Sequence, residues 1–211
     1  MTCIVRKRLT NLTWNVGFNA AYNKRKITKL TVQNDPAFIG IPVGEISGGT
    51  NSQIQITAVN NQPNSFFVYK QVYDKNNKPV EGLYTDLNGD GVINEQDLYI
   101  SNRNPYPVVS VGFNTSLGYR KWTVSTSLHG NIGNYVYNNT ASSSGYTDAL
   151  FNNTGATLQN VSTGIYSTLF KTRQLFSDYY LENASFIRMD NATLSYNAGK
   201  ILRDKVGLLI S

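Results

Sequence analysis

Residues 86–97 carry the types and spacing of oxygen ligands that a calcium ion requires. Their sequence, Asp-Leu-Asn-Gly-Asp-Gly-Val-Ile-Asn-Glu-Gln-Asp, matches the EF-hand-type loop at loop positions 1, 3, 5, 6, 8 and 12, with Asp where Glu usually closes the loop. Calcium is a hard cation that takes about 6–8 oxygen ligands at about 2.3–2.6 Å. We therefore predict a calcium site formed by Asp86, Asn88, Asp90, Val92, Asn94 and Asp97.

Each position in this loop has a distinct expected role. The first three side chains of the set supply oxygens from alternate positions of one turn, and Val92 offers its main-chain carbonyl. Asn94 acts directly or through water, and Asp97 closes the shell with a side chain that reaches less far than Glu. Gly91 permits the sharp bend, and we expect Ile93 to pack into the local core.

The surroundings of this loop indicate a structural clip. A full EF-hand has a helix on each side of the loop, whereas residues 78–85 have the pattern of a strand or turn. A lone loop suits a structural metal in a long surface connection better than a calcium sensor. The alternative interpretation is a metal-free turn, because Asn, Gly and Asp favour turns for their own reasons.

Strands, not helices, are the elements expected to position this loop. In residues 12–22 every second residue is apolar, and the residues between are mostly small or polar. Residues 109–119, 122–132 and 186–196 show the same period of two, and 205–211 begins another such segment. A transmembrane strand needs about 9–11 residues. We predict an all-β fold, namely an antiparallel transmembrane β-barrel segment with about five spanning strands.

The connections between these segments alternate in length. Long connections follow the segments at 12–22 and 122–132. The connection at Arg120-Lys121 and a turn near Gly199-Lys200 are short. Outer-membrane barrels have long extracellular loops and short periplasmic turns. Four aromatic residues lie at strand ends beside the short turns, as expected of a girdle at one membrane interface: Trp14, Tyr119, Trp122 and Tyr196.

The composition supports the barrel prediction and argues against a transmembrane helix and against nucleic-acid binding. Only 15% of residues are charged, and the polar face of the strands is rich in Gly, Ser, Thr and Asn, which suits enclosed water. The chain has no apolar run long enough for a transmembrane helix. Despite the net charge of +6, no basic stripe interleaved with aromatic residues indicates nucleic-acid binding. We interpret the clusters at residues 6–8 and 24–26 as polar strand ends.

No set of residues suggests an enzyme. The single histidine, His129, lies on the polar face of a strand, where we expect a hydrogen-bonding role. Arg188 and Asp190 lie two residues apart on the same face of another strand, and we expect them to form an ion pair. No nucleophile elbow, phosphate-binding loop or zinc spacing is present.

Six sequence segments lie, in this order, at residues 12–30, 66–74, 79–94, 112–114, 130–134 and 178–191. They extend over nearly the whole chain and resemble the SusC/RagA family of TonB-linked outer-membrane transporters. The calcium-type loop is the most recognisable of them. The resemblance implies a barrel filled by a plug and capped by a SusD-like lipoprotein. It also implies import of oligosaccharides, or in some members peptides, driven by TonB.

By this resemblance, we expect the family's plug, TonB-contacting segment, signal peptide and last strands to lie outside residues 1–211. We therefore interpret residues 1–211 as the C-terminal portion of such a barrel, located in the outer membrane, with residues 86–97 in a long extracellular loop. An open sheet edge in lipid is costly, so we expect the fragment alone not to insert stably. The alternative is a soluble, calcium-stabilised β-sandwich that binds carbohydrate or acts as an adhesin.

Overall fold

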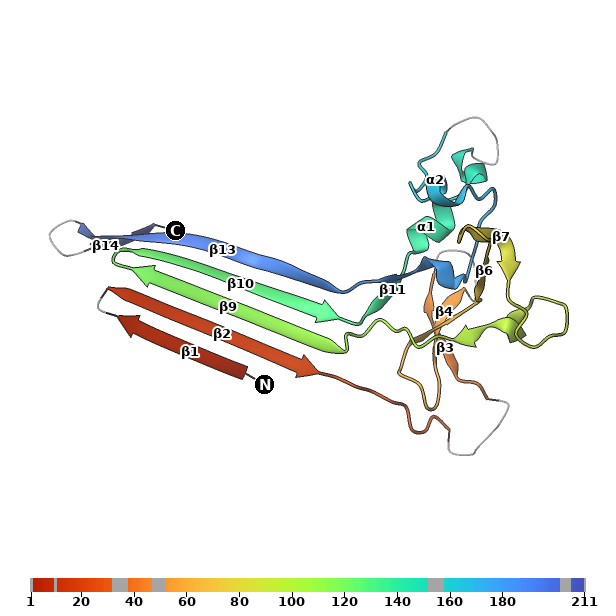
Figure 1. The fold of residues 1–211 in the computed structure, drawn as a ribbon, viewed down its shortest axis with the longest axis horizontal. Helices are drawn as coiled ribbons and strands as arrows, with labels where there is room; N and C mark the ends of the chain where they lie inside the picture. Colours follow the sequence, from red (N-terminus) through yellow and green to blue (C-terminus); the bar gives the residue numbers. More distant parts are fainter. Residues whose placement is uncertain are drawn as a thin grey trace. The chain divides into compact units, whose positions relative to one another are not determined.

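A computed structural model describes residues 2–9, 11–31, 38–46, 52–151, 158–201 and 206–210. The chain forms two compact units that alternate along the sequence. Unit 1 comprises Met1–Asn23, Pro107–Asn134 and Ala184–Ser211, and unit 2 comprises Lys24–Tyr106 and Tyr135–Asn183. Sheet pairing is antiparallel throughout the named strands, which confirms the all-β prediction (Figure 1). No helix among the described residues is both long and apolar enough to cross a membrane.

Unit 1 is one six-stranded sheet with the order β1-β2-β9-β10-β13-β14. Its strands are β1 (Thr2–Leu9), β2 (Leu12–Tyr22), β9 (Val109–Tyr119), β10 (Trp122–Ile132), β13 (Phe186–Ile201) and β14 (Val206–Ile210). The three segments expected at 12–22, 109–119 and 122–132 are strands with those bounds. Period-two patterning located them because each strand has two different faces.

Two expectations about this sheet were wrong. Strand β1 was missed, so the sheet has six strands and not about five; the basic residues 6–8 lie near the end of this strand, as expected, and pair in register with β2. The turn expected near Gly199 is a bulge, and β13 continues to Ile201. Gly199 has a φ of +83°, a left-handed conformation that glycine adopts without a Cβ penalty.

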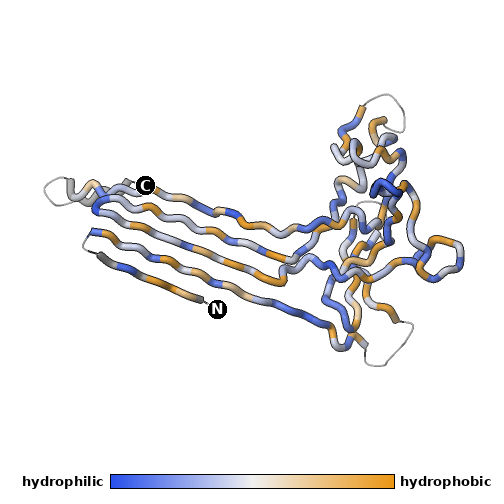
Figure 2. The backbone as a smooth tube through the Cα atoms, in the orientation of Figure 1, coloured by the Kyte–Doolittle hydropathy of each residue, from blue (hydrophilic) through white to orange (hydrophobic). Residues whose placement is uncertain are grey.

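The register places apolar and polar side chains on opposite faces of the sheet. One cross-strand row on the apolar face consists of Phe18, Phe113, Leu128 and Met189. One row on the other face consists of Asn15, Ser116, Ser125 and Thr193. Figure 2 shows the resulting alternation along the central strands. Trp14 and Phe18 on the apolar face remain 47% and 45% exposed.

Gly130 in β10 lies close against the main chain of the neighbouring strand. A Cβ there would lie 2.8 Å from the carbonyl oxygen of Phe186, which main-chain pairing holds in place. We expect Gly130→Ala to destabilise the folded protein by about 1–3 kcal/mol, measured by thermal unfolding. Gly118→Ala is the matched control, because its nearest neighbour lies 3.7 Å away. Equal effects of both substitutions would contradict this prediction.

Unit 2 contains small sheets and short helices around a hydrophobic core. The sheets are β3 (Ile41–Glu45), β4 (Gln53–Thr57), β5 (Ser65–Val68) and β8 (Tyr99–Ile100); β6 (Gln71–Tyr73) and β7 (Pro79–Tyr84); and β11 (Tyr135–Tyr137) and β12 (Leu181–Asn183). The helices are α1 (Asn139–Ser144) and α2 (Ile165–Thr168), with 3-10 turns η1 (Glu95–Asp97), η2 (Thr147–Leu150) and η3 (Asp178–Tyr180). Ile54, Phe66, Val68 and Leu181 form the buried core.

Candidate functional site

The calcium-type loop follows β7 and bends around the side chain of Asp86. The two Asp86 carboxylate oxygens accept hydrogen bonds from the main-chain N–H groups of Gly89 at 2.6 Å and Gly91 at 2.8 Å. Both glycines have left-handed φ angles, +76° and +80°. These angles turn the N–H groups toward the carboxylate, and Gly91 makes the bend that its position in the motif predicts.

Asn88, Asp90 and Asn94 occupy the same turn. The Asn88 side-chain nitrogen lies 2.9 Å from an Asp90 carboxylate oxygen, and the other Asp90 oxygen accepts from the Val92 N–H at 2.8 Å. Asn94 caps η1 by accepting from the Gln96 N–H at 2.8 Å. The expected ligand side chains are therefore oriented by main-chain hydrogen bonds within the loop.

Asp97 closes the loop from inside the fold. Its side chain has no exposed surface, and it accepts main-chain hydrogen bonds from Asn94 at 2.9 Å and Leu87 at 2.8 Å, with a longer one from Asn88 at 3.4 Å. The Asn94 N–H, followed by those of Leu87 and Asn88, lowers the pKa of Asp97. The carboxylate therefore stays ionised at neutral pH and joins the end of the loop to its beginning.

The oxygen-only donor set suits a hard cation, yet calcium binding stays a prediction. Among the described residues, no three acidic, histidine or cysteine side chains converge into a metal centre by themselves. The expected set instead includes two asparagines and a main-chain carbonyl. One local expectation was wrong, because Ile93 is 39% exposed and does not pack into a core. A lone loop offers no pair of flanking helices to cover that side chain.

A polar network that sequence reasoning missed supports the hairpin leading into this loop. The Glu81 carboxylate accepts from the main-chain N–H and the hydroxyl of Thr172, at 2.7 and 2.6 Å. Burial alone would raise the pKa of Glu81, but these bonds and the main-chain bond from Lys171 lower it. Buried Ser177 donates to the Gln71 side chain at 2.7 Å. These partners lie far apart in sequence, so no local pattern indicated them.

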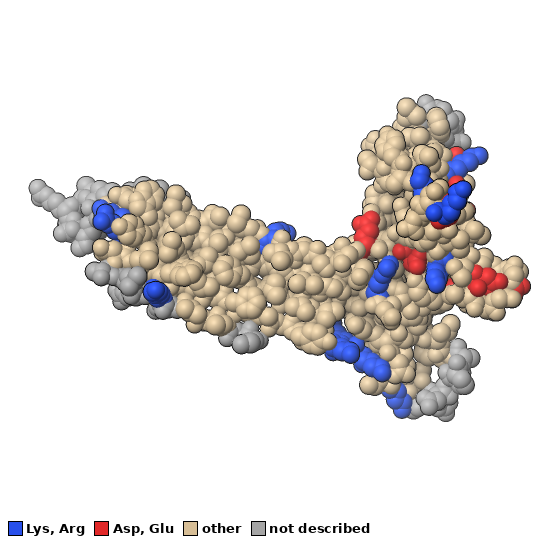
Figure 3. Space-filling view, in the orientation of Figure 1, with Lys and Arg blue, Asp and Glu red and all other residues tan. Residues whose placement is uncertain are grey.

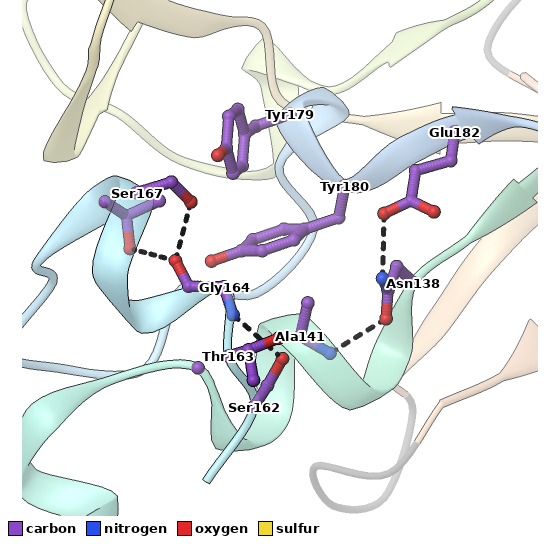
Figure 4. Close-up of a pocket in the computed structure, with 11 residues that line it drawn as sticks. Asn138, Ala141, Ser162, Thr163, Gly164, Ser167, Tyr179, Tyr180 and Glu182 are labelled. Atoms are coloured by element: carbon purple, nitrogen blue, oxygen red, sulfur yellow. Dashed lines mark hydrogen bonds between the residues drawn. The ribbon is translucent and has the colours of Figure 1, made fainter.

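A second candidate site is a cavity of about 370 Å³ in unit 2 (Figure 4). Its walls come from α1, the turn before α2, α2 itself, η3 and β12. It is lined by Asn138, Ala141, Gly145, Ser162, Thr163, Gly164, Ser167, Thr168, Tyr179, Tyr180 and Glu182. Hydroxyl, amide and main-chain groups therefore dominate the lining, beside two aromatic rings and one carboxylate.

Hydrogen bonds hold the polar walls of this cavity in place. Asn138 caps α1 by accepting from the Ala141 N–H at 2.9 Å, and its amide nitrogen donates to Glu182 at 2.7 Å. The Ser167 hydroxyl donates to the Gly164 carbonyl at 2.7 Å. Figure 4 shows the walls formed by Glu182 with Asn138 and by Ser167 with Gly164 on different sides of the Tyr180 ring.

The aromatic part of the cavity consists of two tyrosines in contact with each other. The rings of Tyr179 and Tyr180 meet edge to face with centroids 5.1 Å apart. Burial raises the pKa of Tyr180, so its hydroxyl stays neutral. Tyr179 lines this cavity, whereas Tyr135 and Tyr137 pack against the core of unit 2. The cavity suits a neutral ligand rich in hydroxyl groups.

The polar face of the unit 1 sheet carries a small charged cluster. Arg188 Nε lies 3.8 Å from one Asp190 oxygen, which confirms the expected ion pair. The shorter contact was missed, since His129 Nδ1 lies 2.7 Å from the other Asp190 oxygen. A β-bulge in the pairing of β10 with β13 brings these side chains together, and a period-two pattern contains no signal for a bulge.

The aromatic residues expected at one interface lie at the same end of the apolar face. Tyr119, Trp122 and Tyr196 form one cross-strand row, and Trp14 belongs to the next row. The Trp122 and Tyr196 ring centroids are 4.7 Å apart. All four side chains therefore lie at the end of the sheet that carries the tight turn between β9 and β10.

Comparison with known sequences identifies relatives over most of the chain, although no family model matches it. The chain is 35% identical over 194 residues to the TonB-dependent receptor SusC of Bacteroides thetaiotaomicron, covering 89% of this chain and 19% of that receptor. It is 27% identical over 224 positions to TonB-dependent receptor P3 of Formosa agariphila, covering 96% of this chain and 22% of that receptor.

Solved structures show the same fold. The structure of the RagAB peptide transporter matches 92% of this chain and 22% of its own, with a TM-score of 0.61 at 17% identity. The RagAB peptide importer in its closed-closed state gives a TM-score of 0.60 at 18% identity over the same share of each chain. The chain is therefore a segment of a TonB-dependent receptor. It belongs to the SusC/RagA family of these receptors and spans about a fifth of the length of the curated relatives that it matches.

Proposed function

We propose that the chain is part of an outer-membrane importer, in which the unit 1 sheet is a section of a transmembrane β-barrel. The observation that carries this proposal is the two-faced sheet, whose apolar rows remain exposed on strands of 11 residues such as β2, β9 and β10. This length spans a bilayer when the strands are tilted. The further strands of a longer receptor would pair with the outer edges of β1 and β14, because unpaired main-chain groups are costly in the hydrocarbon of a bilayer.

The ends of the strands support an orientation. The connection between β9 and β10 is a tight turn, whereas the long connections from β2 to β9 and from β10 to β13 leave the opposite end of the sheet. Barrels of this class have tight turns at the periplasmic side and long loops outside the cell. Under this proposal unit 2 is extracellular, and the His129–Asp190 cluster faces the barrel lumen.

The partners and the metal follow from the same proposal. The whole receptor works with a SusD-like surface lipoprotein and is driven by TonB through parts of the receptor outside this chain; it has no enzymatic activity of its own. Its relatives are named as TonB-dependent receptors and as a RagAB peptide transporter. A calcium ion in the loop at residues 86–97 would be held by the six residues assigned above and would neutralise their carboxylates.

We further propose that the imported substrate is an oligosaccharide, with a peptide as the alternative class. The cavity lined by Tyr179 and Ser167 supports this choice, because neutral hydroxyl, amide and main-chain groups suit sugar hydroxyls and an aromatic ring suits the apolar face of a sugar. A peptide terminus or charged side chain would meet only one carboxylate there, that of Glu182, already bonded to Asn138.

The substrate proposal is tested by ligand binding to the full-length receptor. We expect Tyr179→Ala to weaken binding of neutral oligosaccharides by about tenfold, which corresponds to about 1.4 kcal/mol. The matched control is Tyr166→Ala, since Tyr166 is 81% exposed and does not line the cavity. Oligosaccharide arrays and peptide mixtures are compared in parallel. Binding of peptides alone, or equal effects of both substitutions, would contradict the proposal.

A further inference from the structure

We propose that the tight-turn end of the unit 1 sheet binds the headgroups of anionic phospholipids, an inference that rests on the membrane-spanning proposal above. The first observation is the distribution of charge. Lys7, Arg120 and Lys121 lie at this end, and Figure 3 shows Lys and Arg atoms there. Among the described residues of unit 1 the one acidic residue is Asp190, which is engaged by His129 and Arg188.

The second observation is that aromatic rings hold two of these cations at the edge of the apolar face. The Arg120 guanidinium carbon lies 5.3 Å from the Tyr119 ring centroid, and Lys121 Nζ lies 6.0 Å from that of Tyr196. A cation over a ring face keeps N–H donors free for an anion. No described acidic side chain forms an ion pair with either cation.

The main chain fixes the geometry of the turn that carries these cations. Arg120 has a left-handed φ of +54°, and its N–H donates to the Asn11 carbonyl of the neighbouring β1–β2 turn at 3.1 Å. Lys7 is the cross-strand partner of Trp14, on the same face as the aromatic row. Arg120 and Lys121 therefore lie at the turn itself, and Lys7 lies beside Trp14, one row further into the sheet than Tyr119 and Trp122.

The chemistry of this end of the sheet matches a glycerophospholipid. Tyr and Trp rings favour the level of the headgroups, and each basic residue near an anionic surface contributes attraction to its phosphates. Acyl chains would lie along the apolar side chains of β2 and β9, from Trp14 and Leu117 toward the centre of the sheet. In the proposed orientation the tight turns meet the periplasmic leaflet, so we assign the site to phospholipid and not to the lipopolysaccharide of the outer leaflet.

The test measures lipids retained by the full-length receptor. The receptor, extracted from the outer membrane, is incubated with phosphatidylglycerol or phosphatidylcholine of matched acyl chains and examined by native mass spectrometry. We expect the double substitution Arg120→Gln and Lys121→Gln to weaken phosphatidylglycerol retention by about tenfold or more, with phosphatidylcholine retention unchanged. The control exchanges Lys75 and Lys78 for Gln, since both are exposed in the β6–β7 turn of unit 2.

The outcomes separate this proposal from the one on which it rests. Heat-modifiable migration of the double variant confirms that it has folded, and Arg120→Lys should retain most of the binding. A receptor that is embedded in the outer membrane but holds both lipids equally, or whose double variant retains phosphatidylglycerol unchanged, overturns the headgroup site alone. A receptor that is absent from the outer membrane overturns both proposals.

Discussion

Exchange of Asp86 or Asp90 for alanine should remove about half or more of the calcium-dependent stabilisation of the full-length receptor. Each substitution deletes carboxylate oxygens from a set in which charge and number of ligands determine affinity. We expect affinity to fall by about 10- to 100-fold or more, measured by calorimetric titration of chelator-treated protein. In the parent, calcium at about 100 times its Kd should add about 2.7 kcal/mol of stability, whereas the variants should gain at most about 1.4 kcal/mol at the same concentration.

Two further substitutions separate loss of metal from loss of turn structure. Asp90→Asn keeps an oxygen that can accept from the Val92 N–H but loses the charge, so affinity should fall while the metal-free stability changes little. Asp74→Ala is the control, because Asp74 likewise accepts main-chain hydrogen bonds, from Asn76 and Lys78, in a turn without the calcium pattern. The calcium assignment fails if all four variants bind the metal as the parent does.

The strands of unit 1 could be predicted from the sequence because their two faces meet different surroundings. In β2 the apolar residues from Leu12 to Tyr22 alternate with small or polar ones, and this pattern survives without any knowledge of the partner strands. Strand β1 carries Ile4 and Val5 next to each other, one on each face, followed by three basic residues. Its alternation is therefore too weak to indicate a strand, and only pairing with β2 defines it.

The calcium-type loop was predictable for a different reason, since its geometry is local. Gly89 and Gly91 both donate to the Asp86 side chain within six residues, so the motif specifies its own turn. The cavity and the polar network depend on residues brought together by tertiary structure. Ser177 and Gln71, for example, are separated by 106 positions. The contact of His129 with Asp190 depends on a bulge, which shifts the register by one residue and has no compositional signature.

An arginine in place of Leu128 should prevent most of the full-length receptor from assembling in the outer membrane, whereas an arginine in place of Ser127 should be tolerated. These residues are neighbours near the centre of β10 and face opposite ways. Leu128 pairs with Phe113 and Met189 on the apolar face. At the bilayer midplane an outward-facing Arg costs about 2–4 kcal/mol. The measurement is the heat-modifiable fraction of receptor in isolated outer membranes.

A third variant tests whether hydrocarbon, and not a protein core, covers this face. Val124 lies one row from the row of Tyr119, Trp122 and Tyr196. The cost of an outward-facing Arg in a membrane barrel falls to about 0–1 kcal/mol near the interface. Val124→Arg should therefore reduce assembly much less than Leu128→Arg. In a soluble sandwich, burial against a second sheet would penalise both substitutions alike. Equal losses at the two positions would therefore contradict the membrane-spanning sheet, because a bilayer makes the penalty depend on depth along the strand.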